Sequence, residues 1–277
     1  LAARHKRTAR AAVRVNPDVD AATHPYISTG LKQHKFGIDI ADAEAVYERA
    51  RAMENLVLEG VSCHIGSQIL DIQPMLEVFD KMVALAQRLR ARGWPIRTLD
   101  LGGGLGVPYK PGDPAPCISD YVNAVCAKAA DHGLEILIEP GRSIVAEAGL
   151  LLTRVLYRKS NGGKEFVIVD AAMNDLLRPA LYNSHHEILP LRQNQAGTIT
   201  ADVVGPVCET GDFLARGREM PNVMPGELLA IRTAGAYGFV AASNYNARPR
   251  PPEILVEGAT YRVVRKRETY EDLIRGE

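Results

Sequence analysis

The chain has 277 residues, of which 46% are hydrophobic and 24% are charged, as in ordinary globular proteins of one large or two smaller domains. Lysine plus arginine and aspartate plus glutamate number 33 each, so the net charge is zero; neither nucleic acid nor an anionic membrane is favoured as a partner. No apolar run is long enough to cross a bilayer. The four cysteines show no CxxC spacing, which argues against disulfides and zinc. We therefore expect no metal and a cytoplasmic location.

The first half of the chain alternates predicted strands with amphipathic helices. The strands are expected at residues 11–15 and around Val61, Leu99 and Ile136, and the helices at residues 40–53, 74–92 and 119–132. Ser119 is expected to be the N-cap of the last helix. This alternation predicts βα units and a parallel sheet. Four strand-plus-loop units amount to about half of a TIM-type β/α barrel.

From about residue 147 the pattern changes to strands without long helices between them. The strands are expected at residues 151–157, 165–170, 198–204, 228–233, 253–256 and 260–264, and short helices at residues 170–182 and 270–274. Such a pattern predicts a mostly antiparallel β domain, Greek-key or sandwich-like. The expected architecture is therefore a partial β/α barrel in residues 1–146 and a β domain in residues 147–277.

Each of the last three strands in the first half ends in a short polar segment that contains glycine. The segments carry His64 and Ser67, then Gly102, Gly103 and Gly104, then Glu139, Gly141 and Arg142. The carboxyl ends of neighbouring parallel strands lie together, and such sheets bind their ligands there. A flat ring, backbone amides exposed by glycine, an acid and a base suit a planar anion that contains nitrogen. The plain alternatives are a core histidine, a helix-capping serine and ordinary turns.

Two further motifs offer groups for catalysis and for substrate binding. Cys208 and Glu209 follow a strand in a turn that contains glycine. A thiol exposed there can exchange protons, whereas a buried free cysteine is commonly inert. Arg178 and Tyr182 are four residues apart and would share a helix face. They predict either a clamp for a carboxylate or a surface ion pair.

Tyrosine and histidine pairs complete the set of candidate residues. Tyr237 and Tyr245 lie in loops rich in glycine and asparagine. Their hydroxyls would either contact a phosphate or hold the loops in place. His185 and His186 have no second ligand pair at helical spacing, which favours a surface or interface pair over a metal site.

Taken in order, these segments resemble the fold-type III pyridoxal-phosphate-dependent decarboxylases, and among them the diaminopimelate decarboxylase family. The resemblance extends from about residue 13 to residue 269. Its most telling stretches are residues 14–17, 28–32, 35–37, 64–68, 170–175, 204–209 and 242–246. Single stretches are weak signals, but their order along one chain is specific.

The resemblance implies pyridoxal 5'-phosphate as cofactor and the decarboxylation of meso-2,6-diaminopimelate to L-lysine and CO2, a step of lysine biosynthesis. It implies that His64 stacks on the cofactor ring and that Glu139 contacts the pyridine nitrogen. The residues expected around the phosphate or the adjoining substrate are Ser67, Gly104, Gly141, Arg142 and Tyr237. The residues expected to receive the substrate's spectator carboxylate are Arg142, Arg178 and Tyr182.

The same resemblance implies that each active site is shared between two subunits of a homodimer. Glu209 would face the distal amine of the substrate. Cys208 would donate the proton, reaching in from the second subunit. A paired arginine and tyrosine would reject amino acids without a second carboxylate, because their buried polar groups would then be left unpaired.

One departure concerns the lysine that forms the Schiff base with the cofactor in this family. The family carries it on an early barrel strand, and no lysine of this chain matches it, since Lys32 and Lys35 lie in the loop after the first predicted strand. The chain begins at Leu1 in a basic stretch without the apolar core of a signal peptide. We expect a fragment that is inactive alone. The alternatives are a lysine from another chain, a non-catalytic paralogue, or a decarboxylase of ornithine, arginine or polyamine precursors.

Overall fold

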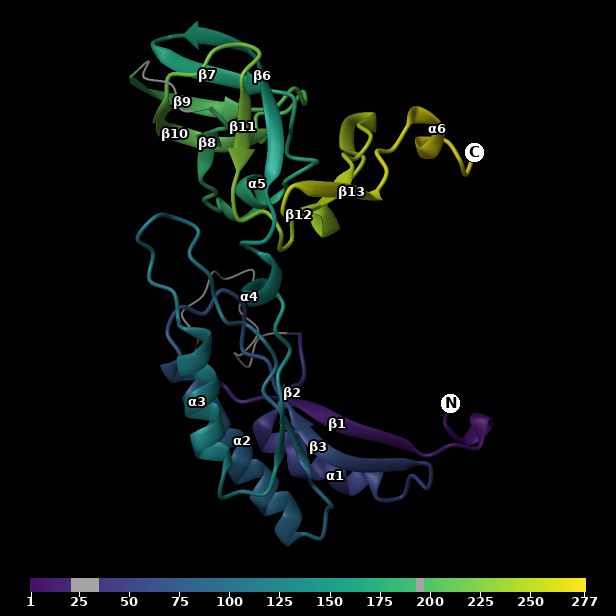
Figure 1. The fold of residues 1–277 in the computed structure, drawn as a ribbon. Coiled ribbons are helices and arrows are strands. Elements are labelled where there is room, and N and C mark those ends of the chain that lie inside the picture. Colours follow the sequence, from purple (N-terminus) through teal and green to yellow (C-terminus); the bar gives the residue numbers. More distant parts are fainter. Residues whose placement is uncertain (21–34, 193–196) are drawn as a thin grey trace. The chain divides into compact units, whose positions relative to one another are not determined.

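The computed structural model describes residues 1–20, 35–192 and 197–277 of the chain. The chain divides into two compact units (Figure 1). The first comprises Leu1–Pro108 and Asp113–Ile144, and the second comprises Tyr109–Gly112 and Val145–Glu277. No helix among the described residues is long and apolar enough to span a membrane.

The first unit is built on a five-stranded sheet in the order β2-β1-β3-β4-β5. The strands are β1 (Ala9–Asn16), β2 (Ile38–Asp39), β3 (Leu56–Ser62), β4 (Thr98–Asp100) and β5 (Glu135–Leu137). Every neighbouring pair is parallel. The parallel sheet expected of a partial β/α barrel is therefore confirmed, with the short β2 as an additional strand.

The three helices that the sequence predicts form in the expected order, and shorter helical segments accompany them. The predicted helices are α1 (Ala43–Ala50), α2 (Gln73–Ala91) and α3 (Ile118–Ala129), and the short segments are η1 (Ala3–His5), η2 (Ile40–Asp42) and α4 (Arg142–Val145). The long helix α2 begins with a proline in its first turn, where a missing N–H breaks no hydrogen bond. It packs against β3 and β4 and lies beside α3.

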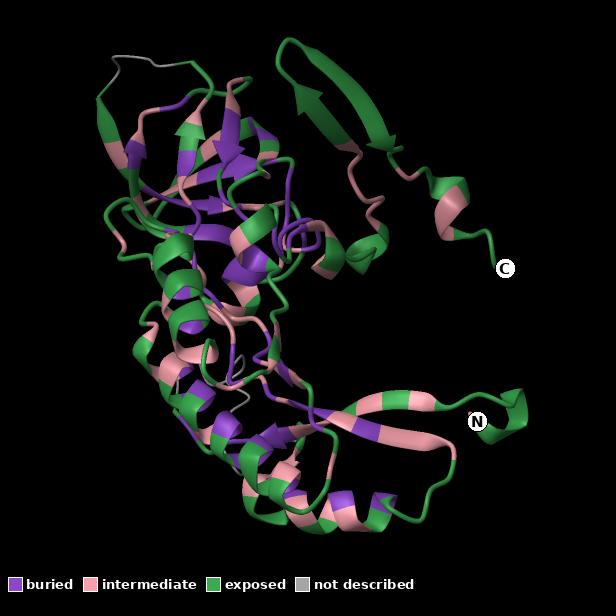
Figure 2. Ribbon diagram, turned by 60° about the horizontal axis from the view of Figure 1, so that its bottom comes forward, coloured by how far each residue is buried: buried purple, intermediate pink, exposed green. Residues whose placement is uncertain are grey.

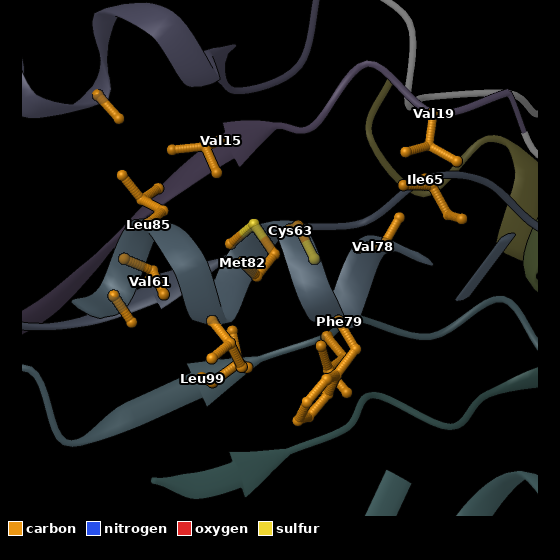
Figure 3. Close-up of a cluster of buried hydrophobic side chains, with 14 of the residues drawn as sticks. Val15, Val19, Val61, Cys63, Ile65, Val78, Phe79, Met82, Leu85 and Leu99 are labelled. Carbon is orange, nitrogen blue, oxygen red and sulfur yellow. The ribbon is translucent and has the colours of Figure 1, made fainter. Parts of the chain in front are cut away.

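The core of the first unit lies between α2 and the sheet (Figure 3). Phe79 and Met82 from α2 meet Val61 and Leu99 from the strands, and all four are at most 1% exposed. Each such side chain contributes about 1.5–3 kcal/mol by burial. The apolar residues whose spacing predicts this helix are therefore the ones that cover one face of the sheet.

One local prediction in the first unit is wrong, and one expected strand forms with an exposed surface. The N-cap of α3 is Cys117, not Ser119, because the helix begins one residue before Ser119 and the serine Oγ lies 2.9 Å from the Cys117 sulfur. Strand β5 is not buried, since Leu137 is 43% exposed. The reason is that β5 is the edge strand of the five described strands.

The second unit is built on a six-stranded sheet in the order β10-β9-β7-β6-β11-β8. The strands are β6 (Leu151–Asn161), β7 (Lys164–Val169), β8 (Ile188–Pro190), β9 (Thr198–Val204), β10 (Phe213–Pro221) and β11 (Leu228–Ile231). All pairings are antiparallel except β7 with β9. The mostly antiparallel β domain is thus confirmed, but β8 and β10 were missed. Arg216, Arg218 and Glu219 interrupt the apolar pattern of β10 where its register shifts.

The helix expected over residues 170–182 is wrong in its first two thirds. Only α5 (Arg178–Tyr182) forms. Asp170 accepts hydrogen bonds from the Thr153 hydroxyl and the Arg154 amide, and Asp175 accepts from the Ala172 amide at 2.9 Å. A short polar side chain that bonds to nearby backbone, as Asp175 does, competes with helix formation. Asp170 instead ties the start of the segment to β6.

The chain ends in a β-hairpin and a short helix. The hairpin pairs β12 (Glu253–Glu257) with β13 (Thr260–Arg265), and α6 (Tyr270–Leu273) follows, capped reciprocally by Thr269 and Asp272. Two short helices, η3 (Phe239–Ala241) and η4 (Tyr245–Ala247), precede the hairpin. Every residue of β13 is exposed (Figure 2). Both strands of the hairpin and the final helix were expected.

Candidate functional site

The three polar segments of the first unit lie side by side beyond β3, β4 and β5, which are consecutive in the sheet. Backbone hydrogen bonds continue the pairing past the strand ends. The Cys63 amide donates to the Asp100 carbonyl at 2.9 Å, and the Leu101 amide donates to the Leu137 carbonyl at 3.0 Å. The register of the sheet therefore carries these segments to one edge.

His64 is held there as a neutral ring of defined tautomer. The Gly103 amide donates to His64 Nδ1 at 3.1 Å, so Nδ1 is the acceptor and the ring proton sits on Nε2. Burial and, second, the charge of Arg14 lower the pKa of His64. A Cβ at Gly102 would come within 2.8 Å of the ring nitrogen. Only glycine at position 102 therefore leaves room for this ring position.

Glu139 lies on the other side of the same glycines. Its amide donates to the Gly102 carbonyl at 2.9 Å. A Cβ at Gly103 would stand 2.2 Å from the Glu139 carbonyl oxygen, so the two backbones are in direct contact. The structure thus brings His64 and Glu139 to one place, against Gly102 and Gly103, and leaves Glu139 exposed.

Groups that bind anions gather beside this ring and acid. Arg142 is 7% exposed and its Nη2 donates to Ser67 Oγ at 3.0 Å. Gly104 adopts a φ of +112°, and a Cβ there would approach the Gly66 carbonyl oxygen to 2.3 Å. By contrast, a Cβ at Gly141 would meet no heavy atom within 4 Å. A guanidinium, a hydroxyl and glycine backbone beside open space form a donor set for a phosphate.

In the second unit, Cys208 and Glu209 lie in the loop between β9 and β10, and both are exposed. Asp212, only 3% exposed, holds this loop from inside. Its two carboxylate oxygens each accept at 2.7 Å, one from the Met173 amide and one from the Val207 amide. Burial raises the pKa of Asp212. The carboxylate fixes the base of the loop, so the thiol and Glu209 are presented at its tip.

The Glu209 carboxylate is oriented by Tyr245. The tyrosine hydroxyl donates to Glu209 Oε2 at 2.6 Å, and this bond raises the pKa of the phenol. Glu209 and Tyr245 line a pocket of about 250 Å³ together with Met173, Asn174, Leu177 and Ser243. Of the two roles predicted for Tyr245, the contact with Glu209 corresponds to holding a loop residue in place.

Arg178 begins α5 and is buried, at 5% exposure, whereas Tyr182 is half-buried. Arg178 Nη1 lies 2.8 Å from His186 Nε2, and its guanidinium lies 4.3 Å from the centre of the Tyr109 ring. The expectation that His185 and His186 form a surface or interface pair is wrong for His186, which is fully buried within the second unit. The interpretation of Arg178 as part of a surface ion pair is excluded by its burial.

Comparisons with known proteins agree with these observations. The family model described as "Pyridoxal-dependent decarboxylase, pyridoxal binding domain" matches residues 1–146. The diaminopimelate decarboxylase of Aquifex aeolicus is 49% identical over 274 residues, which cover 99% of this chain and 65% of that protein. The diaminopimelate decarboxylase of Neisseria meningitidis serogroup A is 50% identical over 277 residues, 100% of this chain and 68% of that protein.

A solved structure extends the similarity to three dimensions. It is diaminopimelate decarboxylase from Helicobacter pylori complexed with L-lysine, with a TM-score of 0.93 and 44% identity over 99% of this chain and 68% of that one. The chain belongs to the diaminopimelate decarboxylase family. It spans about two thirds of the length of the curated relatives.

The family depends on pyridoxal phosphate, and the strand-end residues of the first unit fit that group. Arg142 and Ser67 suit its phosphate, the neutral ring of His64 offers a flat face, and Glu139 offers an acid. The wall of the site is glycine backbone in which added Cβ atoms would collide with neighbouring carbonyls. The donor set and the cradle are thus both present among this chain's own residues.

The residues predicted at the strand ends lie together in the structure, and the role of each toward cofactor or substrate stays a prediction. Tyr237, in the second unit, has a left-handed backbone with φ +58° and is 46% exposed; its role and that of Tyr182 stay predictions. The stretch at residues 28–32 lies outside the described residues. Sequence reasoning missed Asp212, His186 and Tyr109 as supporting residues. Of these three, only Asp212 could have been found from sequence, since it is the last residue of the segment 208–212 that begins at Cys208.

Proposed function

We propose that the protein decarboxylates meso-2,6-diaminopimelate to L-lysine and CO2 with pyridoxal 5'-phosphate, as a step of lysine biosynthesis. The observation that carries this proposal is identity of about one half to diaminopimelate decarboxylases along nearly the whole chain. The chemistry of the two groups of residues supports it. One group suits a phosphorylated pyridine ring, and the other suits an amino acid with two charged ends.

The cofactor, when bound, supplies a protonated ring that accepts the electron pair left by the departing CO2. In this proposal the imidazole of His64 stacks on that ring and Glu139 keeps its nitrogen protonated. The phosphate is held by Ser67, Gly104, Gly141, Arg142 and Tyr237. Because His64 accepts a hydrogen bond from Gly103, its face is available at a defined angle without adding a positive charge.

The second unit would recognise the end of the substrate that does not react. Arg142, Arg178 and Tyr182 would receive the spectator carboxylate, and Glu209 would receive the distal amine. Tyr237 would contact the substrate beside the phosphate. The hydrogen bond from Tyr245 supports this role of Glu209, since it directs one carboxylate oxygen and leaves acceptor capacity on the group. A buried arginine left without a carboxylate disfavours ornithine and similar amino acids.

Cys208 would donate the proton that completes the reaction, and Glu209 acts beside it. The thiol lies at the tip of an exposed loop, which supports the inference that Cys208 reaches the site of a second subunit in a homodimer. The cysteine usage supports a cytoplasmic location. General acid catalysis of this kind requires the thiol to lie within hydrogen-bond distance of the carbon that loses CO2.

The test is CO2 release by the complete gene product loaded with pyridoxal phosphate. We expect turnover of meso-2,6-diaminopimelate and little turnover of ornithine or arginine. In Arg178→Leu, kcat/KM for diaminopimelate should fall on the order of a hundredfold, since a charge-assisted clamp is lost. Preference for ornithine or arginine would reassign the substrate. Cofactor binding without turnover of any of the three would indicate a non-catalytic paralogue.

A further inference from the structure

His186 connects the arginine of the candidate substrate site to the β-sheet of the second unit. It lies between α5 and β8, immediately before the point where β8 pairs with β11. Its backbone carbonyl accepts a hydrogen bond from Arg218 Nη1 at 2.8 Å. The ring is therefore carried on a backbone that is itself attached to β10.

The hydrogen-bond partners of the ring determine its tautomer. His186 Nδ1 lies 2.9 Å from the Arg232 carbonyl oxygen, and a carbonyl only accepts, so Nδ1 carries the proton. Nε2 lies 2.8 Å from Arg178 Nη1, and a guanidinium only donates, so Nε2 is the acceptor. Both contacts require the same neutral ring. A ring protonated at both nitrogens would point an N–H at the guanidinium.

The surroundings restrict what this ring can do. His186 is 0% exposed, and both of its nitrogens have partners, which argues against a role in proton exchange with the substrate. Tyr109 packs edge-on against the imidazole, with ring centres 5.3 Å apart at 76°, and its face lies under the Arg178 guanidinium. A neutral imidazole and a phenol ring thus both contact the guanidinium, and neither of them carries a negative charge.

We propose that His186 is a positioning residue for substrate recognition: its Nε2 fixes the plane of the Arg178 guanidinium that receives the spectator carboxylate. The proposal rests on the function proposed above, because Arg178 needs a carboxylate to receive. Its chemical basis is that an arginine aligned in advance binds a carboxylate through two parallel hydrogen bonds, and a rotated one does not. Loss of this alignment lowers the affinity only for ligands that carry this carboxylate.

Inhibition by L-lysine, the product, and by cadaverine, its diamine analogue, separates a loss of carboxylate recognition from a general distortion of the site. L-Lysine keeps the carboxylate and amine of the unreacted end, whereas cadaverine lacks both carboxylates. In His186→Asn of the complete holoenzyme, the side-chain amide can still donate to the Arg232 carbonyl, but the acceptor for Arg178 is lost. We expect the inhibition constant of L-lysine to rise roughly tenfold, equivalent to about 1.4 kcal/mol, and that of cadaverine to stay unchanged.

A matched variant keeps the hydrogen bond that His186→Asn loses and loses the one that it keeps. His186→Gln places an amide oxygen near the Nε2 position, so it keeps the acceptor for Arg178 and loses the bond to Arg232. L-Lysine inhibition should then be close to wild type, and the KM for diaminopimelate should rise in the Asn variant only. His185→Asn is the control, since His185 Nδ1 lies 3.1 Å from Arg218 Nη2.

The proposal would be overturned if His186→Asn raised the inhibition constants of L-lysine and cadaverine equally, or if it changed neither of them. If both His186 variants fail to fold, nitrogen chemical shifts of the wild-type imidazole decide, because an Nε2-protonated ring contradicts it. A wild-type enzyme that neither turns over diaminopimelate nor binds L-lysine refutes the proposed function instead. The two failures are therefore distinguishable.

Discussion

The two units hold their candidate functional groups by different kinds of contact. In the first unit, backbone atoms of the strand ends position His64 and Glu139, through the amide of Gly103 and the carbonyl of Gly102. In the second unit, side chains do this work: Asp212 holds the Cys208 loop, and Tyr245 holds Glu209. The first site should therefore not tolerate a Cβ at Gly102, Gly103 or Gly104, and the second should be impaired by the loss of single polar atoms.

The largest effect is expected where backbone meets backbone. Gly103→Ala places a Cβ 2.2 Å from the Glu139 carbonyl oxygen, which no side-chain rotation relieves. We expect the free energy of unfolding of the full-length protein to fall by about 3 kcal/mol, measured by urea denaturation. Gly141→Ala is the control for stability, because its Cβ meets no atom within 4 Å. Equal losses in both variants would contradict the tight backbone contact.

The next effect concerns the buried carboxylate of the second unit. Asp212→Asn retains one carbonyl oxygen, so either the Met173 or the Val207 amide is left facing an NH2 group. We expect a loss of about 2 kcal/mol in the free energy of unfolding, with the exposed Asp131→Asn as control. A stability equal to wild type would show that the loop is held by other contacts.

A smaller effect should appear in activity alone. Tyr245→Phe removes the donor to Glu209 Oε2 while both residues stay largely exposed. We expect kcat/KM for diaminopimelate to fall roughly tenfold, since one charge-assisted hydrogen bond is lost, with stability changed by less than about 0.5 kcal/mol. The control for loss of a tyrosine hydroxyl is Tyr261→Phe, because Tyr261 is 76% exposed. An unchanged kcat/KM would remove Tyr245 from the site.

The smallest effect is a pH dependence of stability. The pKa of His64 is lowered from 6.5 by burial, so its contribution to stability is complete above 6.5 and is lost as pH falls through the folded-state pKa. Titration of His64 alone changes the free energy of unfolding by at most about 1.4 kcal/mol per pH unit. His64→Asn keeps an acceptor for Gly103 and should flatten the curve. Urea denaturation between pH 7.5 and 5.5 measures the difference, and parallel curves would refute the buried neutral ring.

Local periodicity predicted the elements well wherever one face of an element is buried. Helix α2 carries apolar residues at helical spacing because that face meets the sheet, and its predicted range agrees with the structure. Strand β5 has an equally apolar sequence but is exposed at the sheet edge. Apolar content therefore indicates a strand without saying how many neighbours cover it.

The errors arose where side chains compete with the backbone or interrupt a pattern. Asp170 accepts from the Arg154 amide on β6 and Asp175 from the nearby Ala172 amide, and the first part of the predicted helix is a turn. Strand β10 was missed because a bulge and charged residues break its alternation. His186 could not be assigned, since its neighbour in sequence, His185, has a similar local context but is only half-buried.

The sequence alone determined the class of fold, the strand-end residues and the family, because strand endings and ordered motifs are local properties of the chain. Only the tertiary structure decided which side chains support the functional ones. Tyr109, Asp212 and Tyr245 reach their partners through folding that brings distant segments together, and no spacing rule encodes such contacts. The tautomer of His186 is likewise a property of what surrounds it: a carbonyl on one side and a guanidinium on the other.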